Sequence, residues 1–337
     1  MLEDNEDVLA AEKAQQLADA GKKPEPVFYD TLFRAKKNHT LREVPGPIPP
    51  LEGPVADTHA HLSCLLHRDL TMARAAAHQV GFICDITDIV EDAGSSYAGL
   101  EGWEFSAASW LSTLVPDDTP FLPTVRLGCG CHPHNAKDYD SVIEAALLQK
   151  LRDGRTCVVG EVGLDYHYDL SPRDVQRTVF RRQIRIAHRT GLPIALHVRE
   201  AHTDALSILD EEGFPEAGTI LHCFNLGPDD LQPWLDRDCF IAFGGPVTFK
   251  KAEEVRQAAR MVPIDRLLTE TDCPYMTPEP LRGRENGPEC IVFTAAKLAE
   301  VRGCEPGSAR HEFLADLYRN ATGLLDRGPT PWQLSAR

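Results

Sequence analysis

From residue 54 onward, short runs of apolar residues alternate with longer segments in which apolar positions recur at helical spacing. Several of the short runs are continuously hydrophobic, which is typical of parallel strands covered on both faces. Eight strands that alternate with helices predict an α/β fold, a (β/α)8 TIM barrel, rather than an open sheet. The predicted strands span residues 55–59, 81–86, 125–131, 157–162, 194–198, 219–224, 240–244 and 267–271.

The clearest helical segment is 173–189, which begins after a Ser-Pro pair and ends at a Gly-Leu-Pro stop signal. The segment 91–123 has the weakest pattern, and we interpret it as a helix with an inserted loop. Four further helices are expected at residues 202–212, 229–236, 252–261 and 288–302.

The first 50 residues differ in composition from the rest of the chain. Residues 2–20 are rich in Ala, Glu and Leu and form a candidate amphipathic helix, and five prolines between positions 45 and 54 then make a stiff connector. We therefore divide the chain into an N-terminal extension, 1–50, and a TIM-barrel domain, 51–337. We expect the extension to pack on the outside of the barrel or to form an oligomer contact.

The composition is that of an ordinary globular protein, with 42% hydrophobic and 26% charged residues among 337. No run approaches the ~18 apolar residues that a membrane span needs. The first residues are acidic and polar rather than signal-like, so we expect a cytoplasmic protein without a membrane contact. The ten cysteines are scattered along the chain, which favours reduced and mostly buried thiols over disulfides.

The formal net charge of −16 opposes non-specific attraction to nucleic acid, because polyanions are held mainly by Lys and Arg. A protein of this charge that cleaves nucleic acid needs a local source of positive charge. Bound divalent metals or clustered arginines can supply it.

Histidines and carboxylates gather where the predicted strands end, and TIM-barrel active sites lie at the carboxyl ends of the strands. His59 and His61 close the first strand, and side chains two positions apart on a strand point to the same face. Glu161 ends an apolar strand, where a carboxylate is costly to bury unless it is paired or bound to a cation. His197, His222 and Asp272 end the fifth, sixth and eighth strands.

These six side chains are enough to hold two divalent metal ions. Mixed nitrogen and oxygen ligands suit zinc, manganese, cobalt or iron, and magnesium suits the oxygen-rich side. Two metals ~3.5–4 Å apart can clamp a phosphate and activate a water as nucleophile. We expect Glu161 to bridge the metals, and we expect Asp272 to orient the water or relay its proton.

Eight motifs occur in order over about residues 54–325 and resemble those of the TatD family of metal-dependent deoxyribonucleases, within the amidohydrolase-like barrels. The resemblance implies that His59, His61, Glu161 and Asp272 hold one metal and that Glu161, His197 and His222 hold the second. Other amidohydrolases often carry a carboxylated lysine where this chain has Glu161, which favours the TatD branch. The motifs are DTHAHL (57–62), GCHPH (130–134), VGEVGLDY (159–166), LHVREA (196–201), LHCF (221–224), TFKKA (248–252), LLTETDCPYM (267–276) and LRGRENGP (281–288).

Further residues near these motifs are candidates for contacts with the substrate. His132 and His134 follow the third strand and are expected to contact a phosphate or assist proton transfer. Arginine can bind phosphate with two parallel hydrogen bonds, which makes Arg199, Arg282 and Arg284 candidate phosphate ligands. Additional candidates near the site are Asp165, Tyr166, His167 and Glu270.

The leading hypothesis is a metal-dependent hydrolase that cleaves phosphodiester bonds, as an exonuclease acting on DNA ends. The alternative is hydrolysis of a small phosphoester, ester or amide at the same site, which the acidic balance favours. A third possibility is a non-catalytic interaction module that uses the extension, and the six intact ligand positions argue against it. The sequence leaves the oligomeric state open.

Overall fold

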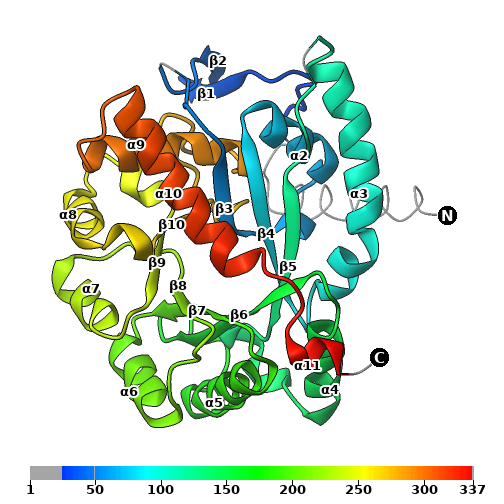
Figure 1. Cartoon of the computed structure of the whole chain (residues 1–337), viewed down its shortest axis with the longest axis vertical. Coiled ribbons are helices and arrows are strands. Elements are labelled where there is room, and N and C mark those ends of the chain that lie inside the picture. The colour runs from blue at the N-terminus through cyan, green and yellow to red at the C-terminus, as the bar shows by residue number, and fades with distance from the viewer. Residues whose placement is uncertain (1–24, 49, 118, 336–337) are drawn as a thin grey trace.

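Eight parallel strands form one sheet in which each strand is hydrogen-bonded to the next along the chain, from β3 to β10. The computed structural model describes residues 25–48, 50–117 and 119–335, so the helix expected at 2–20 lies outside the described residues. The sheet curls into a barrel with helices on its outside, which confirms the predicted TIM barrel (Figure 1). The strands are β3 Val55–Ala60, β4 Val80–Asp88, β5 Thr124–Gly130, β6 Thr156–Asp165, β7 Ile194–Arg199, β8 Thr219–Leu221, β9 Phe240–Phe243 and β10 Leu267–Thr269.

Two strands end more than one residue earlier than the sequence predicts. The expected strand 219–224 stops at Leu221, and the expected strand 267–271 stops at Thr269. Just beyond these ends, the backbone becomes left-handed, with φ of 49° at Cys223 and 55° at Asp272. A left-handed residue cannot continue a strand, so the chain leaves the sheet there.

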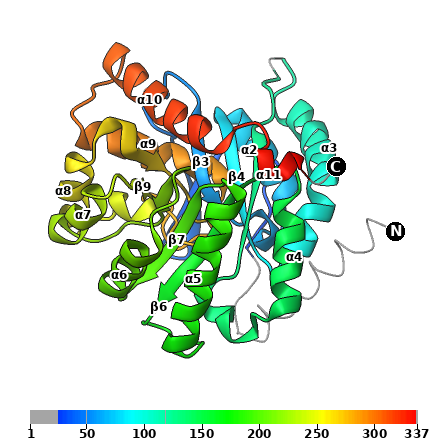
Figure 2. The ribbon, with the colours of Figure 1, turned by 60° about the horizontal axis from the view of Figure 1, so that its bottom comes forward.

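Helices surround the sheet, and the long helix α10 (Ser308–Leu325) covers the end of the barrel where the strands start. Leu324 and Leu325 of this helix pack with inward-facing residues near the strand starts, such as Ala56 and Phe82. The helix crosses the barrel in Figure 1, and Figure 2 shows the other helices flanking the strands. The helices are α2 Arg68–Ala77, α3 Ala93–Leu114, α4 Ser141–Leu151, α5 Arg173–Thr190, α6 His202–Glu212, α7 Pro228–Leu235, α8 Glu253–Met261, α9 Ile291–Val301, α10 Ser308–Leu325 and α11 Pro331–Leu334.

The first and last barrel strands, β3 and β10, meet without a regular ladder. A single bridge pairs Ala60 with Cys273, and the backbone N–H of His61 donates to the Cys273 carbonyl at 3.0 Å. The fully buried carboxylate of Asp57 accepts a hydrogen bond from the backbone N–H of Thr271 at 2.8 Å. This seam therefore depends on individual hydrogen bonds, several of them from side chains.

The described part of the extension contains a hairpin that the sequence analysis missed. Strands β1 (Phe33–Lys37) and β2 (Thr40–Val44) pair antiparallel around Asn38 and His39, which both have positive φ. Positive φ at both central residues is typical of the tight turns that join hairpin strands. The Phe33 ring lies 4.3 Å from His78 and 4.8 Å from Phe293, centroid to centroid, so the hairpin packs on the outer helices. The division at residue 50 stays a prediction.

Replacing Phe33 with alanine should lower the free energy of unfolding by about 3 kcal/mol, because a buried aromatic side chain is lost and a cavity remains. Phe33 is only 4% exposed. Chemical denaturation measures the change, and Phe121→Ala is the matched control because Phe121 is 97% exposed. Equal stabilities of the two variants would show that the hairpin does not depend on this contact.

In the described part of the chain, no helix combines the length and the apolar character that crossing a bilayer requires. All ten cysteines are free thiols and most are buried, as the sequence analysis predicted. Cys84 and Cys157 face each other inside the barrel with their sulfur atoms 3.7 Å apart.

Candidate functional site

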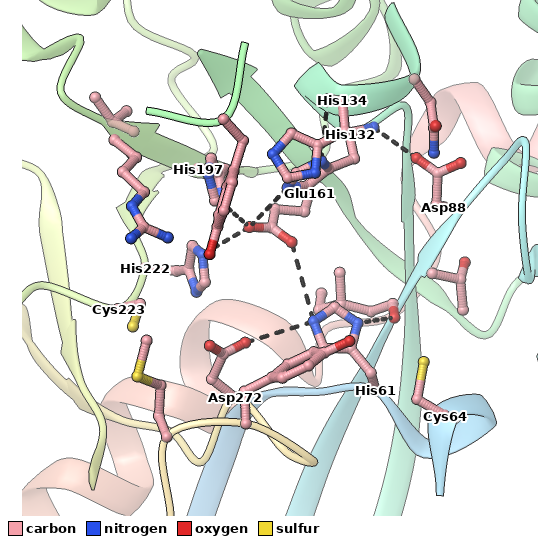
Figure 3. Close-up of a pocket in the computed structure, with 18 of the residues that line it drawn as sticks. His61, Cys64, Asp88, His132, His134, Glu161, His197, His222, Cys223 and Asp272 are labelled. Atoms are coloured by element: carbon pink, nitrogen blue, oxygen red, sulfur yellow. Dashed lines mark hydrogen bonds and ion pairs between the residues drawn. The ribbon is translucent and has the colours of Figure 1, made fainter. Parts of the chain in front are cut away.

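The structure brings the six predicted metal ligands together at the mouth of the barrel, around the carboxylate of Glu161. Figure 3 shows the ligands other than His59. Glu161 is 7% exposed and comes from β6, the longest strand, which is buried at every position. Its Oε1 lies 2.6 Å from Nε2 of His222 and 2.7 Å from Nδ1 of His197.

The second oxygen of Glu161 faces the other predicted ligands. Oε2 lies 3.5 Å from Nε2 of His59 and 4.0 Å from Nε2 of His61. Nε2 of His61 also lies 3.5 Å from Oδ1 of Asp272. The Glu161 carboxylate thus lies between two groups of predicted ligands, and each group faces a different carboxylate oxygen. This is the arrangement expected of a bridging ligand.

The histidine side chains are oriented by partners outside the cluster. Nδ1 of His61 lies 2.9 Å from the carbonyl oxygen of Ile86, so Nδ1 carries a proton and Nε2 is the nitrogen that faces Glu161. Nδ1 of His222 lies 3.6 Å from the fully buried Glu270, too far for a hydrogen bond, while Nε2 of His222 faces Glu161. Partners such as the Ile86 carbonyl fix the tautomer that a metal ligand needs.

The charge distribution of the cluster favours a cation. Although burial raises it, His222, His132 and His197 together hold the pKa of Glu161 well below its usual value. Burial lowers the pKa of His59, which keeps this imidazole neutral, the form that binds metals. Although burial opposes it, the carboxylate of Asp272 and then that of Glu161 raise the pKa of His61 to about 10.

The residues present fit a divalent metal. Among the described residues, Nε2 of His59 and Nδ1 of His222 are buried without a hydrogen-bond partner, which is costly unless something binds there. Three sets of side chains have ligand atoms within 4.8 Å of one another. The sets are His59, His61 and Asp272; His132, Glu161 and His197; and His59, His222 and Glu270.

Asp165 supports this cluster from behind and is fully buried. Its Oδ2 accepts hydrogen bonds from Nε2 of His197 at 3.0 Å and from Nε2 of His134 at 2.9 Å. Burial raises the pKa of Asp165, but the hydrogen bonds from His197 and His134 and one from the backbone of Tyr168 outweigh this effect and lower the pKa below its usual value. The carboxylate is therefore ionised. Nε2 of His197 therefore carries the proton, and its Nδ1 presents a lone pair toward Glu161.

Asp165→Asn should weaken metal binding by about 10- to 100-fold, the usual cost of losing a partner that orients a ligating histidine. Competition with a chromogenic chelator for Mn²⁺ or Zn²⁺ measures the affinity. Asp169→Asn is the control, because Asp169 only pairs with Arg173 on the surface. Equal metal affinity in the two variants would show that Asp165 does not orient His197 for metal binding.

Three of the predicted substrate-binding residues line the cavity of about 620 Å³ above the cluster: His132, His134 and Arg199. Nε2 of His132 lies 3.9 Å from Oε1 of Glu161, close enough for His132 to act as a metal ligand instead. The Arg199 guanidinium lies 4.7 Å from the ring centroid of Tyr168.

The other two predicted substrate-binding residues, Arg282 and Arg284, lie elsewhere and do not line this cavity. The Arg282 guanidinium stacks 4.1 Å from the ring centroid of Phe249. Arg284 donates from Nε to Glu25 at 2.8 Å and also to the backbone carbonyl of Arg34. Arg284 is thus bound by the N-terminal extension. The two residues Arg284 and Glu25 are 259 positions apart in the sequence, so a local motif cannot reveal their contact.

Several residues that line the cavity were missed by the sequence analysis. Most of them lie on loops or at helix ends, where no periodic pattern marks them, and Asp88 ends β4, two residues beyond the predicted strand. Burial raises the pKa of one of them, Asp88, to about 6. These residues are Cys64, Asp88, Tyr168, His202, Tyr275 and Met276.

Comparisons with known proteins show relatives over most of the chain. The family model described as TatD related DNase matches residues 56–323. The uncharacterized metal-dependent hydrolase YcfH of Escherichia coli (strain K12) is 35% identical over 256 residues, covering 74% of this chain and 88% of the relative. The 3'-5' ssDNA/RNA exonuclease TatD of Citrobacter koseri is 32% identical over 182 residues, covering 52% of this chain and 70% of the relative. The crystal structure of YJJV, a TatD homolog from Escherichia coli K12, shares the fold, with a TM-score of 0.66 and 24% identity over 81% of this chain and 98% of that one.

Proposed function

The chain belongs to the family of TatD-related DNases, and from this membership we propose that it is a metal-dependent hydrolase of phosphodiester bonds that acts as an exonuclease on DNA. The observation that carries the proposal is the position of Glu161, whose two oxygens face separate groups of histidines at the floor of an open cavity. The relative from Citrobacter koseri, named as an exonuclease on single-stranded DNA and RNA, supports the substrate class.

The ligand sets follow from the family motifs and from the geometry of the cluster. His59, His61, Glu161 and Asp272 would hold one divalent ion, and Glu161, His197 and His222 the other. Such ions, magnesium, manganese or zinc, supply Lewis-acid stabilisation of the phosphate and lower the pKa of a bound water toward neutrality.

The chain's own residues position the substrate and move the proton. The carboxylate of Asp272, 8% exposed at the cavity floor, accepts the proton of the attacking water. His132 and Arg199 line the cavity and would donate hydrogen bonds to phosphate oxygens of the substrate. His134 also lines it, with its Nε2–H already donated to Asp165. The surrounding low-polarity walls strengthen these interactions, because buried charges are screened less than exposed ones.

The size of the cavity and the charge of the protein both support cleavage at strand ends. A volume of about 620 Å³ is that of a small-molecule site, large enough for a strand end but not for a duplex passing through. The net charge of −16 disfavours extended contact with a polyanion. The same two observations favour the second candidate function, hydrolysis of a small phosphoester.

An assay with end-labelled oligonucleotides tests the proposal. Protein loaded with Mg²⁺, Mn²⁺ or Zn²⁺ is incubated with single-stranded DNA, blunt duplex DNA and bis(4-nitrophenyl) phosphate. We expect products shortened stepwise from one end, at a rate that falls as salt increases. Cleavage of the small diester alone would establish the second candidate function. Absence of all cleavage, by protein shown to contain metal, would reject both.

A further inference from the structure

His202 lines the same cavity as the metal ligands, but it belongs to none of the ligand sets. It is the first residue of α6 (His202–Glu212) and follows β7 closely. Its recorded ring contact is with Trp234 of α7, at 5.8 Å between centroids. In the described ranges, no ion pair or ring contact joins His202 to the histidines around Glu161.

The Trp234 indole determines which nitrogen of His202 carries the proton. Nε1–H of Trp234 donates to Nδ1 of His202 at 3.1 Å. An indole nitrogen can only donate, so Nδ1 must be the acceptor and the neutral ring carries its proton on Nε2. Burial lowers the pKa of His202, which favours this neutral ring. His202 therefore presents a fixed N–H donor.

Two donors on this wall of the cavity have no acceptor. No hydrogen bond recorded for residues 25–48, 50–117 and 119–335 uses Nε2 of His202, and none uses the Arg199 guanidinium, which is held by stacking on Tyr168. Two acidic residues, Glu200 and Asp204, lie two positions from His202 along the chain. Glu200 accepts from Nδ1 of His167 at 2.7 Å, and Asp204 accepts from the Tyr166 hydroxyl at 2.7 Å. Asp230 acts on His202 only through its charge. Two donors that line the same cavity and have no acceptor among the described residues suit an anionic oxygen of a bound ligand.

We propose that His202 is a substrate-binding residue that donates from Nε2 to a second phosphate of the substrate, one that is not hydrolysed, in the cavity that Arg199 also lines. This inference rests on the proposed function, which places the scissile phosphate at Glu161. His202 has no contact with the Glu161 cluster, so its partner is an anionic group farther along the substrate. The wall around His202 then selects a substrate with at least two phosphates, an oligonucleotide, over an isolated diester.

Kinetics on two substrates test the inference. Thymidylyl-thymidine with a 5'-phosphate carries a second phosphate, and bis(4-nitrophenyl) phosphate carries only the scissile one. For His202→Phe we expect KM for the dinucleotide to rise roughly tenfold with kcat nearly unchanged, because a hydrogen bond to a charged group is lost. The kinetics on the small diester should not change. His202→Gln, which retains an N–H donor, should recover most of the loss.

Further variants separate substrate binding from a structural role. Trp234→Phe removes the indole donor and frees the tautomer, so its KM for the dinucleotide should lie between those of the wild type and His202→Phe. His188→Phe is the matched control, because His188 is exposed on α5 and bonds only the Gly213 carbonyl. An unchanged KM in His202→Phe, or an equal change on both substrates, would overturn the inference.

A binding measurement keeps this test independent of the proposed activity. Calorimetry with thymidine 3',5'-bisphosphate is performed on metal-loaded wild type and His202→Phe. We expect roughly tenfold weaker binding in the variant. If the wild type hydrolyses neither substrate but shows this difference, the proposed function fails and the anion contact stands. Equal affinities, or no binding to the wild type, contradict the inference itself.

Discussion

Glu161→Gln is expected to abolish metal binding at both positions and to reduce phosphodiester hydrolysis by more than about 10³-fold, since the ions contribute several kcal/mol to the transition state. Both Glu161 oxygens face imidazole nitrogens, at 2.6 Å from His222 on one side and 3.5 Å from His59 on the other. An amide offers one oxygen and no negative charge, so it cannot serve both groups.

Elemental analysis and kcat measured on the same preparation check this prediction. Glu101→Gln on α3 is the matched control, because the Glu101 side chain is 87% exposed and far from the cavity lining. Circular dichroism should show the same helix content in both variants. A Glu161→Gln protein that keeps two equivalents of metal and normal activity would rule out the bridging role.

Removing the metal with a chelator is expected to stop hydrolysis and to lower the melting temperature by about 5 °C. A ligand present at 100 times its dissociation constant stabilises the folded state by about 2.7 kcal/mol, which corresponds to a shift of this size in a protein of several hundred residues. The physical reason is that a buried ligand atom such as Nε2 of His59, which has no hydrogen-bond partner in the protein, is left unsatisfied without the metal.

Differential scanning calorimetry before and after dialysis against EDTA measures the shift. Returning Mn²⁺ or Zn²⁺ should restore both the melting temperature and the activity, and the metal that restores both at the lowest concentration identifies the preferred ion. The idea fails if metal-free protein, verified by elemental analysis, melts and reacts as before.

The fold could be predicted from the sequence because hydrophobic runs and helical periodicity report burial directly. All eight strands and the helix α6 (His202–Glu212) lie where the pattern places them. The errors lie where backbone conformation rather than burial decides, as at Cys223, whose left-handed φ falls inside the predicted strand 219–224. The hairpin at Phe33–Val44 was missed because its strands are short and its outer face is polar.

The candidate ligands could be found from the sequence because the barrel brings strand ends to one rim. Residues that act through tertiary contacts were harder to assign. Arg284 looks like a phosphate ligand in its motif, yet it bonds Glu25 of the extension. His202 carries no motif, and only the Trp234 contact reveals its tautomer. The local sequence predicts which residues lie at the carboxyl ends of the strands, but not which tertiary hydrogen bonds they form.

The seam between β3 and β10 makes the cluster of metal ligands depend on two segments that lie far apart in the chain. His59 and His61 stand on one side of it and Asp272 on the other, and hydrogen bonds cross it between positions 211 residues apart. Joining such distant segments is slow, because a long loop must close before its contacts form. A chain that has not yet joined β10 to β3 therefore lacks a complete set of metal ligands, so metal uptake should follow the closure of this seam and stabilise the finished barrel.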